Sequence, residues 1–236
     1  MAPWVRLLGL LVAVVAAALF LKVLPPVLVL ALMVGGIVYA NHVLTVKPKR
    51  ERSKTTAQLL GLRVVPEAQA GLSAFPFALL ERPEARTLEV MAGPWRGTEV
   101  RLFDLETRPS VPVAETQSVR RFSCVLAPLP FETPHLVVEP ESFLTPPEDR
   151  PDLPISVLAS ERVAAACDVR CQDPAFASTF LDGSLGAWLL AQQDGVAFET
   201  RGPAVLLYQP WVPAKDRDLL LESLLGFLDA ASTREE

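Results

Sequence analysis

The first 46 residues carry almost no charge, and this feature constrains the fold of the chain more than any other. They contain two cations, Arg6 and Lys22, and no acidic residue. Two apolar runs fill most of the segment, with Lys22 and a pair of prolines between them. Taken as residues 4–24 and 25–46, each stretch has about 20 residues, enough to cross a hydrocarbon core of about 30 Å as a helix. The sequence therefore predicts a transmembrane helical hairpin over residues 1–46.

A cleavable signal peptide is the alternative interpretation of residues 1–24, because one early arginine precedes an apolar run. Its candidate cleavage site, Ala16–Ala18, lies inside that run, and a second apolar run follows. A chain cleaved there would still keep a membrane anchor. Pro25 and Pro26 fit the first turn of a second helix, because proline lacks the N–H that would be unpaired there.

A cluster of cations follows the apolar segment and predicts its orientation. Residues 47–54 carry five cations and one acidic residue, whereas the connection between the apolar runs carries only Lys22. By the positive-inside rule this basic juxtamembrane stop faces the cytoplasm, and Arg6 agrees with that orientation for a two-pass hairpin. We therefore expect both termini in the cytoplasm. The cations are also candidates for binding anionic headgroups of membrane lipids: Lys47, Lys49, Arg50, Arg52 and Lys54.

Residues 55–236 are long enough to bury a core of their own and are expected to form a soluble domain. They carry 15 cations and 26 acidic residues, a net charge of −11. Because such a unit repels phosphate, its charge excludes a nucleic-acid partner and favours a basic protein partner. Proline is frequent here and breaks the chain into short elements, since 19 of the 22 prolines follow residue 46. The densest run, residues 140–154, predicts a loop that divides the domain into two halves.

Alternating apolar and polar residues predict strands in the first half of this domain. A β-hairpin is expected over residues 86–91 and 99–105, with its turn at Gly93–Gly97. Further strands are expected over residues 121–129 and 135–138. Upstream of them, a helix that ends at a glycine is expected over residues 55–61.

The second half mixes strands and helices. Cys167–Cys171 predicts a short strand, and Asp173 is a suitable N-cap for a helix that Pro174 opens. Another helix is expected over residues 183–193.

The last part predicts a second hairpin and a final helix. The hairpin consists of residues 196–201 and 204–209 about Gly202–Pro203. The helix spans residues 213–231. The order of these elements predicts an α+β fold with an antiparallel sheet, preceded by the transmembrane helical hairpin. The apolar face of the final helix is expected to consist of Leu219, Leu220, Leu224, Phe227 and Leu228.

Three cysteines and two histidines are the main reactive side chains. An odd number of thiols facing a reducing cytoplasm argues against a disulfide framework. Cys167 and Cys171 share a face of their strand but lack the Cys-x-x-Cys spacing of zinc and redox sites, so we expect no metal and no cofactor. Cys124 and His135 form a conceivable catalytic pair, because adjacent strands can meet and an imidazole can take the thiol proton. This pair is the basis of the alternative function, a membrane-tethered hydrolase with a nonstandard site.

Trp95 and Arg96 in the predicted turn are the candidate partner-binding residues, because tryptophan and arginine are enriched at binding hot spots. The alternative is a tryptophan folded over its own hairpin beside a solvated arginine. The sequence contains no phosphate-binding loop, dinucleotide fingerprint, serine-hydrolase elbow or HExxH motif. The residues therefore favour a binding or scaffolding module at the inner face of the membrane over an enzyme.

Six short motifs follow one another in the domain: LGLRVVP at 60–66, FPF at 75–77, GPWRGTEVRLFD at 93–104, PHLVVEPE at 134–141, VRCQDPAFA at 169–177 and GPAVLLY at 202–208. In this order the chain resembles a family of uncharacterised bacterial membrane-anchored proteins with an N-terminal transmembrane segment and a cytoplasmic α+β domain. The resemblance covers about residues 55–230. It implies a bacterial inner-membrane setting and an α+β architecture, and it implies no catalytic residue.

Overall fold

The computed structural model describes residues 30, 33, 34, 36, 47–82, 84–108, 119–143, 145, 149–158, 160–192 and 195–233. The chain divides into two units, Met1–Arg52 and Ser53–Glu236, and the second is called the folded unit below. Apart from four positions, the hairpin predicted over residues 1–46 lies outside the described residues. Within the parts of the chain that are described, no helix is both long enough and apolar enough to cross a membrane.

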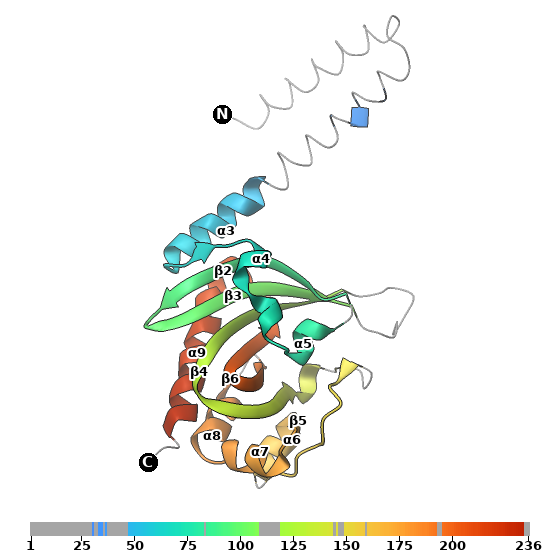
Figure 1. Ribbon diagram of the computed structural model, residues 1–236, viewed down its shortest axis with the longest axis vertical. Helices are drawn as coiled ribbons and strands as arrows, with labels where there is room; N and C mark the ends of the chain where they lie inside the picture. Colours follow the sequence, from blue (N-terminus) through green and yellow to red (C-terminus); the bar gives the residue numbers. More distant parts are fainter. Residues whose placement is uncertain are drawn as a thin grey trace, which may run out of the picture. The chain divides into compact units, whose positions relative to one another are not determined.

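A six-stranded antiparallel sheet forms the centre of the described folded unit (Figure 1). Strands β1 to β5 lie side by side in chain order, and β6 pairs with β4. This sheet and the helices around it confirm the predicted α+β class. The strands are β1 (Arg63–Val64), β2 (Arg86–Trp95), β3 (Thr98–Thr107), β4 (Arg120–Pro140), β5 (Cys167–Cys171) and β6 (Ala197–Pro210).

The hairpin of β2 and β3 is the predicted one, with a tighter turn. Only Arg96 and Gly97 connect the two strands, and both have positive φ angles, 46° and 88°. A two-residue turn with two positive φ angles matches the right-handed twist of the flanking strands. The prediction of a longer turn was wrong because Gly93 and Pro94, which are usual turn residues, lie inside β2.

The single strand β4 replaces the two strands predicted over residues 121–129 and 135–138. Its first half pairs with β3, its second half pairs with β5, and β6 accompanies both halves. The hairpin predicted about Gly202–Pro203 is also wrong, because β6 passes through these residues as one strand. The proline-rich run at 140–154 and the helix α6 (Glu161–Ala166) after it therefore lie between two paired strands of one sheet, β4 and β5, and Ser53–Glu236 forms one unit rather than two halves.

A bend in β4 and β6 explains why each was predicted as two pieces. Between the pairs Pro128↔Ala204 and Leu136↔Thr200, seven residues of β4 lie opposite three residues of β6. The extra residues let β4 follow the outer side of the bend (Figure 1). In β6 the bend falls at Gly202, whose φ of 59° suits glycine.

The bend also reverses which residues face each side of the sheet. The helix-covered core contains odd-numbered residues of β4 such as Val125 before the bend and even-numbered ones such as Val138 after it. In β6 it contains Phe198 before the bend and Val205 after it. A shift of one residue moves every following side chain to the opposite face. The periodicity along the sequence is therefore interrupted although the strands continue.

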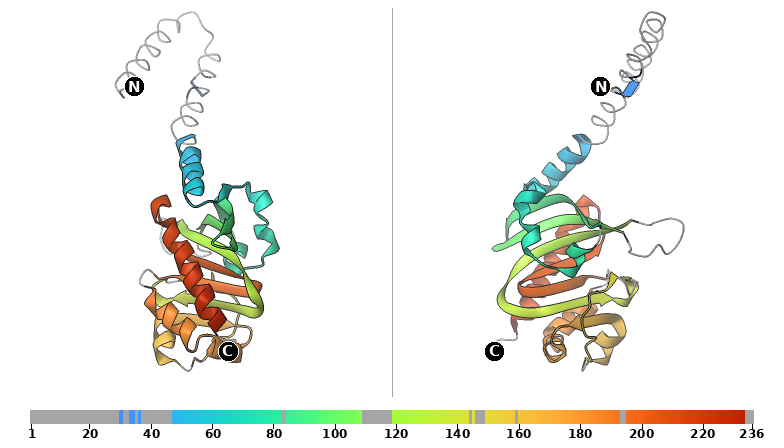
Figure 2. Two further views of the ribbon diagram at one scale, coloured as in Figure 1. Left: turned by 90° about the vertical axis from the view of Figure 1, so that its left-hand side faces the viewer. Right: turned by 45° about the vertical axis from the view of Figure 1, so that its right-hand side comes forward.

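Helices cover one face of the sheet, and a short segment covers the other (Figure 2). We call this segment, residues 66–82, the strap. It contains α4 (Glu67–Ala70), η2 (Leu72–Ala74) and α5 (Ala78–Glu81). Its apolar side chains, Phe77 and Leu79 among them, pack on Leu126 and its neighbours in the sheet. The helices of the opposite face are α6 (Glu161–Ala166), α7 (Pro174–Phe180), α8 (Ser184–Ala191) and α9 (Arg217–Ser232).

Helix ends follow the capping rules used for their prediction. The Asp173 carboxylate accepts hydrogen bonds from the N–H groups of Ala175 and Phe176 at 3.0 and 3.2 Å, so it caps α7 as expected. Helix α3 (Lys47–Leu59) begins earlier than predicted, and Gly61 with a φ of 70° follows its end.

Helix α9 turns a slightly different face to the core than predicted. Leu219 is 57% exposed, whereas Leu221 is fully buried. The remaining buried positions, Leu220, Leu224 and Phe227, agree with the prediction. The buried face of α9 is rotated only slightly from the predicted one, but the rotation places the first residue of the helix, Arg217, in the interior.

Candidate binding site

Asp104 of β3 is fully buried, and four donors converge on its carboxylate. Its Oδ2 accepts hydrogen bonds from Arg121 Nη2 at 2.7 Å, Arg217 Nη2 at 2.9 Å and Trp211 Nε1 at 3.0 Å. Its Oδ1 accepts one from Ser123 Oγ at 3.1 Å. A buried carboxylate needs such donors, because an unpaired buried charge is strongly unfavourable.

The four donors come from β4, from the segment that follows β6 and from the first turn of α9. Ser123 of β4 is the cross-strand partner of Asp104, and its hydroxyl also accepts a hydrogen bond from the N–H of Val212, which fixes the chain after β6. Arg217 is the first residue of α9 and only 3% exposed. Its guanidinium lies 3.5 Å from the Glu89 carboxylate, at a bulge of β2 where the φ of Glu89 is 52°.

The outer part of this cluster is an exposed aromatic and cationic surface. Trp211 is 43% exposed, and 34% of the Arg121 side chain is exposed. The guanidinium carbon of Arg121 lies 4.9 Å from the centre of the Trp211 ring. Because the same buried Asp104 oxygen holds both side chains, a ligand would find them already ordered and would not have to freeze them. We call these two residues the Trp211–Arg121 pair.

A groove of about 420 Å³ lies at the same end of β4. Arg120 donates a hydrogen bond from Nη1 to the carbonyl oxygen of Phe143 at 3.3 Å. The rings of Phe122 and Phe143 stack at 6.0 Å, and the Tyr208 ring lies in an edge-to-face arrangement with each of them. The residues that line the groove are Arg120, Arg121, Phe122, Ser142, Phe143 and Pro210.

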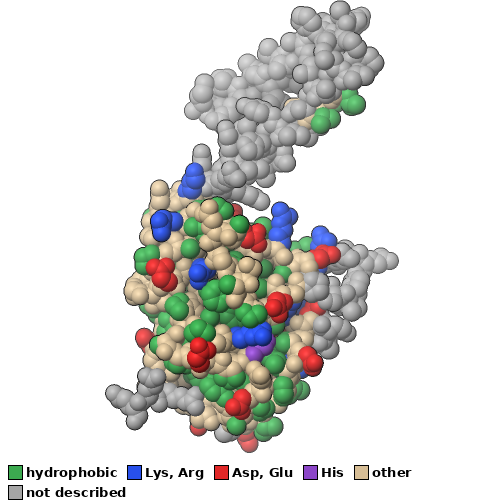
Figure 3. Space-filling model, in the orientation of Figure 1, with side chains coloured by type: hydrophobic (Ala, Val, Ile, Leu, Met, Phe, Trp, Pro, Cys, Tyr) green, Lys and Arg blue, Asp and Glu red, His purple; other side chains and the backbone are tan. Residues whose placement is uncertain are grey.

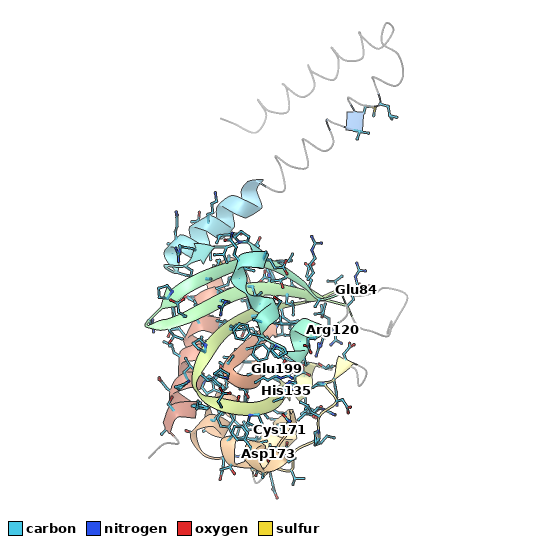
Figure 4. The ribbon with its side chains drawn as sticks, in the orientation of Figure 1. Glu84, Arg120, His135, Cys171, Asp173 and Glu199 are labelled. Atoms are coloured by element: carbon cyan, nitrogen blue, oxygen red, sulfur yellow. The ribbon has the colours of Figure 1, made fainter. Side chains whose placement is uncertain are left out.

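Glu199 of β6 fixes the middle of the strap. It is 1% exposed and accepts hydrogen bonds from the N–H groups of Ala78 and Leu79 at 2.5 and 3.2 Å. Its Oε1 also lies 2.6 Å from Nε2 of His135 (Figure 4). Figure 3 shows this face of the folded unit in the orientation of Figure 1, with acidic and basic side chains scattered among hydrophobic ones.

Glu139 of β4 fixes the end of the strap. Its Oε1 accepts hydrogen bonds from Arg82 Nη2 at 3.2 Å and from the Tyr208 hydroxyl at 2.8 Å. Burial and the neighbouring Glu139 charge raise the pKa of Tyr208 well above its usual value, so its hydroxyl stays protonated and donates. The bend of β4 and β6 places both carboxylates on the strap side.

The structure does not assemble the catalytic pair considered from the sequence. Cys124 lies fully buried in β4 between Phe103 and Tyr208 of the neighbouring strands. Burial, and secondarily the charge of Asp104, raises the pKa of its thiol, which opposes formation of the reactive thiolate. Among the described residues no hydrogen bond joins Cys124 to His135. The geometry therefore gives the hydrolase hypothesis no support.

Trp95 and Arg96, the candidate partner-binding residues of the sequence analysis, make contacts within the folded unit. Arg96 forms a two-pronged ion pair with Glu222 of α9 at 2.6 and 2.9 Å, and its guanidinium lies 4.7 Å from the ring centre of Trp95. Trp95 packs against the helix-covered core. Of the predicted lipid-binding cations, Lys54 is exposed. The side chains of the other four lie outside the described residues: Lys47, Lys49, Arg50 and Arg52.

Sequence reasoning missed the residues around Asp104, although a signal for two of them exists. Asp104 continues the inward alternation of Val100 and Leu102 in β3. Arg217 lies one helical turn before Leu221 and so falls on the buried face of α9. When two separate elements each carry a charged residue at a position where the periodicity predicts a buried side chain, the two residues are expected to form a buried ion pair. Trp211 offers no such pattern, because it lies in the irregular segment after β6.

The fold and this surface define an α+β protein with a preformed aromatic and cationic surface. No protein-family model and no curated protein matches the chain. A solved structure, the crystal structure of the mycobacterial trehalose monomycolate transport factor A (TtfA), is similar with a TM-score of 0.56 and 15% sequence identity. The match covers 76% of this chain and 92% of that chain. At this level of identity, the similarity shows a shared fold.

Proposed function

We propose that this protein is a membrane-anchored binding or scaffolding module whose folded unit faces the cytoplasm at the inner membrane of a bacterium. The observation that carries the binding role is the Trp211–Arg121 pair, because a half-exposed indole and guanidinium are held rigid by one buried carboxylate. Such pairs are typical of interface hot spots. The shared fold with a protein named as a transport factor is consistent with a binding role.

The anchor rests on the charge distribution of the sequence. A segment of 46 residues with two charges precedes five cations within eight residues. Removing residues 1–54 should therefore move the protein from the membrane pellet to the supernatant of a cell lysate. The full chain should stay in the pellet after an alkaline wash, and its release by that wash would contradict an integral anchor.

The binding role predicts a specific contact surface around Trp211. A photoreactive amino acid at the exposed position of Lys215, four residues later, should form a discrete adduct in cells. Leu190 on α8, with 42% exposure, offers a control position of comparable accessibility to Trp211. We expect the adduct from position 215, its loss with Trp211→Ala, and no equivalent adduct from position 190. The same adducts from both positions, or none from 215, would refute the proposed surface.

A conservative variant separates binding from stability in this test. Trp211→Phe keeps an aromatic ring and removes only the Nε1 donor to Asp104. It should keep part of the adduct, whereas Trp211→Ala should lose it at unchanged protein levels. Equal loss in both variants, together with a lower melting temperature, would assign the residue a structural role instead.

A further inference from the structure

We propose that a pocket at the carboxyl end of α9 binds a lysine or arginine side chain from a basic segment of a protein partner. This proposal rests on the proposed binding function and names the chemistry of the partner. The pocket has a volume of about 320 Å³ and lies between the last turn of α9 and the connection from α7 to α8. The 16 residues of α9 span about 24 Å, so the pocket and the Trp211–Arg121 pair lie at opposite ends of this helix.

The ends of three helices form the pocket. Helix α7 ends at Phe180, α8 begins at Ser184, and α9 packs along α8. The Ser184 hydroxyl donates a hydrogen bond to the carbonyl oxygen of Ala230 at 2.8 Å, which joins the start of α8 to the last turn of α9. Phe180 and Ala230 supply apolar parts of the wall, against which the methylene groups of a long basic side chain can pack.

The hydroxyl groups of the pocket have no proton left to donate to a ligand. Those of Thr179, Ser184 and Thr233 each donate a hydrogen bond to a helix carbonyl oxygen, at 3.0, 2.8 and 2.8 Å. A hydroxyl has one proton and two lone pairs, so these side chains can only accept further hydrogen bonds. The charged groups of lysine and arginine carry donors and no acceptor, which matches such a lining.

The pocket also carries a negative charge without a cationic partner. Among the described lining residues Asp182 is the one with a charge, and it is exposed. Its Oδ1 accepts a hydrogen bond from the N–H of Gly183 at 3.1 Å, and no cation of the described residues forms an ion pair with it. The carboxyl end of a helix adds partial negative charge, and the last turn of α9 contains no basic residue. Both features favour a cationic ligand.

An anion and a metal ion fit this lining less well. The first N–H groups of a helix attract anions, and α8 begins at this pocket. The charge of Asp182 opposes an anion there, however, and its carboxylate already accepts the N–H of Gly183. Hard divalent metals take several carboxylate oxygens, whereas the described lining offers one carboxylate. The net charge of −11 over residues 55–236 likewise attracts a basic partner.

The test is photo-crosslinking of peptides to the full chain in nanodiscs of phosphatidylcholine. The probe is a twelve-residue Gly/Ser peptide with a photoreactive benzoylphenylalanine between two lysines. Three matched peptides carry two norleucines, two glutamines or two glutamates in place of the lysines. Adducts are mapped by mass spectrometry. We expect the lysine peptide to label the pocket about five-fold more than each of the others, the upper size of a partly exposed ion pair.

Variants of the protein assign the labelling to the pocket. Asp182→Asn removes the charge, and Thr179→Tyr fills the pocket from an exposed position of α7. Both should lower labelling by the lysine peptide about five-fold at an unchanged melting temperature. Thr179→Ser keeps the hydroxyl, and Glu99→Gln removes an exposed carboxylate of β3, so neither should have an effect. Unchanged labelling of Asp182→Asn, or equal labelling by the lysine and norleucine peptides, would overturn the proposal.

Further results separate this proposal from its alternatives. If the glutamate peptide labels the pocket more than the lysine peptide, the pocket is an anion site and the proposal is wrong. If the lysine peptide labels only a chain that ends at Thr233, Arg234 of this chain competes for the pocket and the partner is rejected. If the adduct at position 215 depends on Trp211 while the lysine peptide labels nothing, the proposed function stands and only the pocket is rejected. If both experiments fail, the binding function fails with the pocket.

Discussion

Replacing Asp104 by alanine tests whether the buried carboxylate organises the candidate site. The substitution removes the acceptor shared by Arg121, Arg217 and Trp211. Arg121 and Trp211 are partly exposed, so water can replace the lost oxygen for them. Arg217 is 3% exposed, and within the described residues its Nε and Nη1 already have no hydrogen-bond partner. The loss therefore falls mainly on Arg217.

The expected destabilisation follows from that burial. Removing one partner of a buried ion pair costs about 3–5 kcal/mol when the other charge remains uncompensated. Because Glu89 stays 3.5 Å from Arg217, we expect Asp104→Ala to lower the free energy of unfolding by about 3 kcal/mol, at the lower end of this range. Glu222→Ala breaks the pair with Arg96, whose side chains are 47% and 58% exposed, and should cost at most about 1 kcal/mol.

Urea unfolding of the segment Ser53–Glu236, produced alone, measures the free energy of unfolding that Asp104→Ala and Glu222→Ala each lose. The double variant Asp104→Ala with Arg217→Leu removes both charges. The double variant should be more stable, by up to about 3 kcal/mol, than the sum of the two single losses predicts. Each single variant leaves one member of the buried pair without its partner, whereas the double variant removes both members. Strict additivity, or an Asp104→Ala loss as small as that of Glu222→Ala, would refute the reasoning.

Three other predictions concern the interior. Burial, and less so Glu141, raises the pKa of the Cys167 thiol to about 11, so alkylation at pH 8 should be about a hundred-fold slower than for a free cysteine. Because the thiol ionises at a lower pH in the unfolded chain than in the folded one, the free energy of unfolding should fall as the pH rises from about 9 to about 11. A free energy of unfolding that rises over this range in the wild type but not in Cys167→Ser would contradict the raised pKa. Glu199→Ala should make the strap sensitive to protease, whereas Glu132→Ala, at an exposed position, should not. Gly226→Ala should cost about 1–3 kcal/mol in thermal unfolding, since its Cβ would lie 2.9 Å from the indole nitrogen of Trp188.

Local patterns predicted those elements in which one periodicity continues from end to end. Strand β3 of the first hairpin and most of the buried face of α9 are of this kind, and the Asp173 cap of α7 was likewise predicted from a local signal, whereas β2 has a bulge at Glu89. β4 and β6 failed because the alternation changes phase at the bend, where Pro130 and Gly202 also resemble turn signals. A bend is decided by the pairing of strands distant in the sequence, and no local window contains that information.

The candidate site was less predictable than the fold. Trp95 and Arg96 were selected for residue type, and their partner Glu222 lies on a distant helix. Trp211 and Arg121 have the same residue types, yet they are 90 residues apart, and tertiary contacts bring them together: their shared acceptor Asp104, the ring contact between them and the hydrogen bond from the Trp211 N–H to the Arg121 carbonyl oxygen. Residue type indicates which side chains suit an interface, whereas the exposed pair is selected by tertiary contacts.

The sidedness of the C-terminus tests the central claim most directly, because an anchored cytoplasmic module requires it to lie inside. Fusions after Glu236 to green fluorescent protein, which fluoresces in the cytoplasm, and to alkaline phosphatase, which is active only outside, give opposite readouts. We predict fluorescence and no phosphatase activity from the full chain in a bacterial host. An active phosphatase with a dark fluorescent fusion would place the folded unit outside and contradict the proposed function.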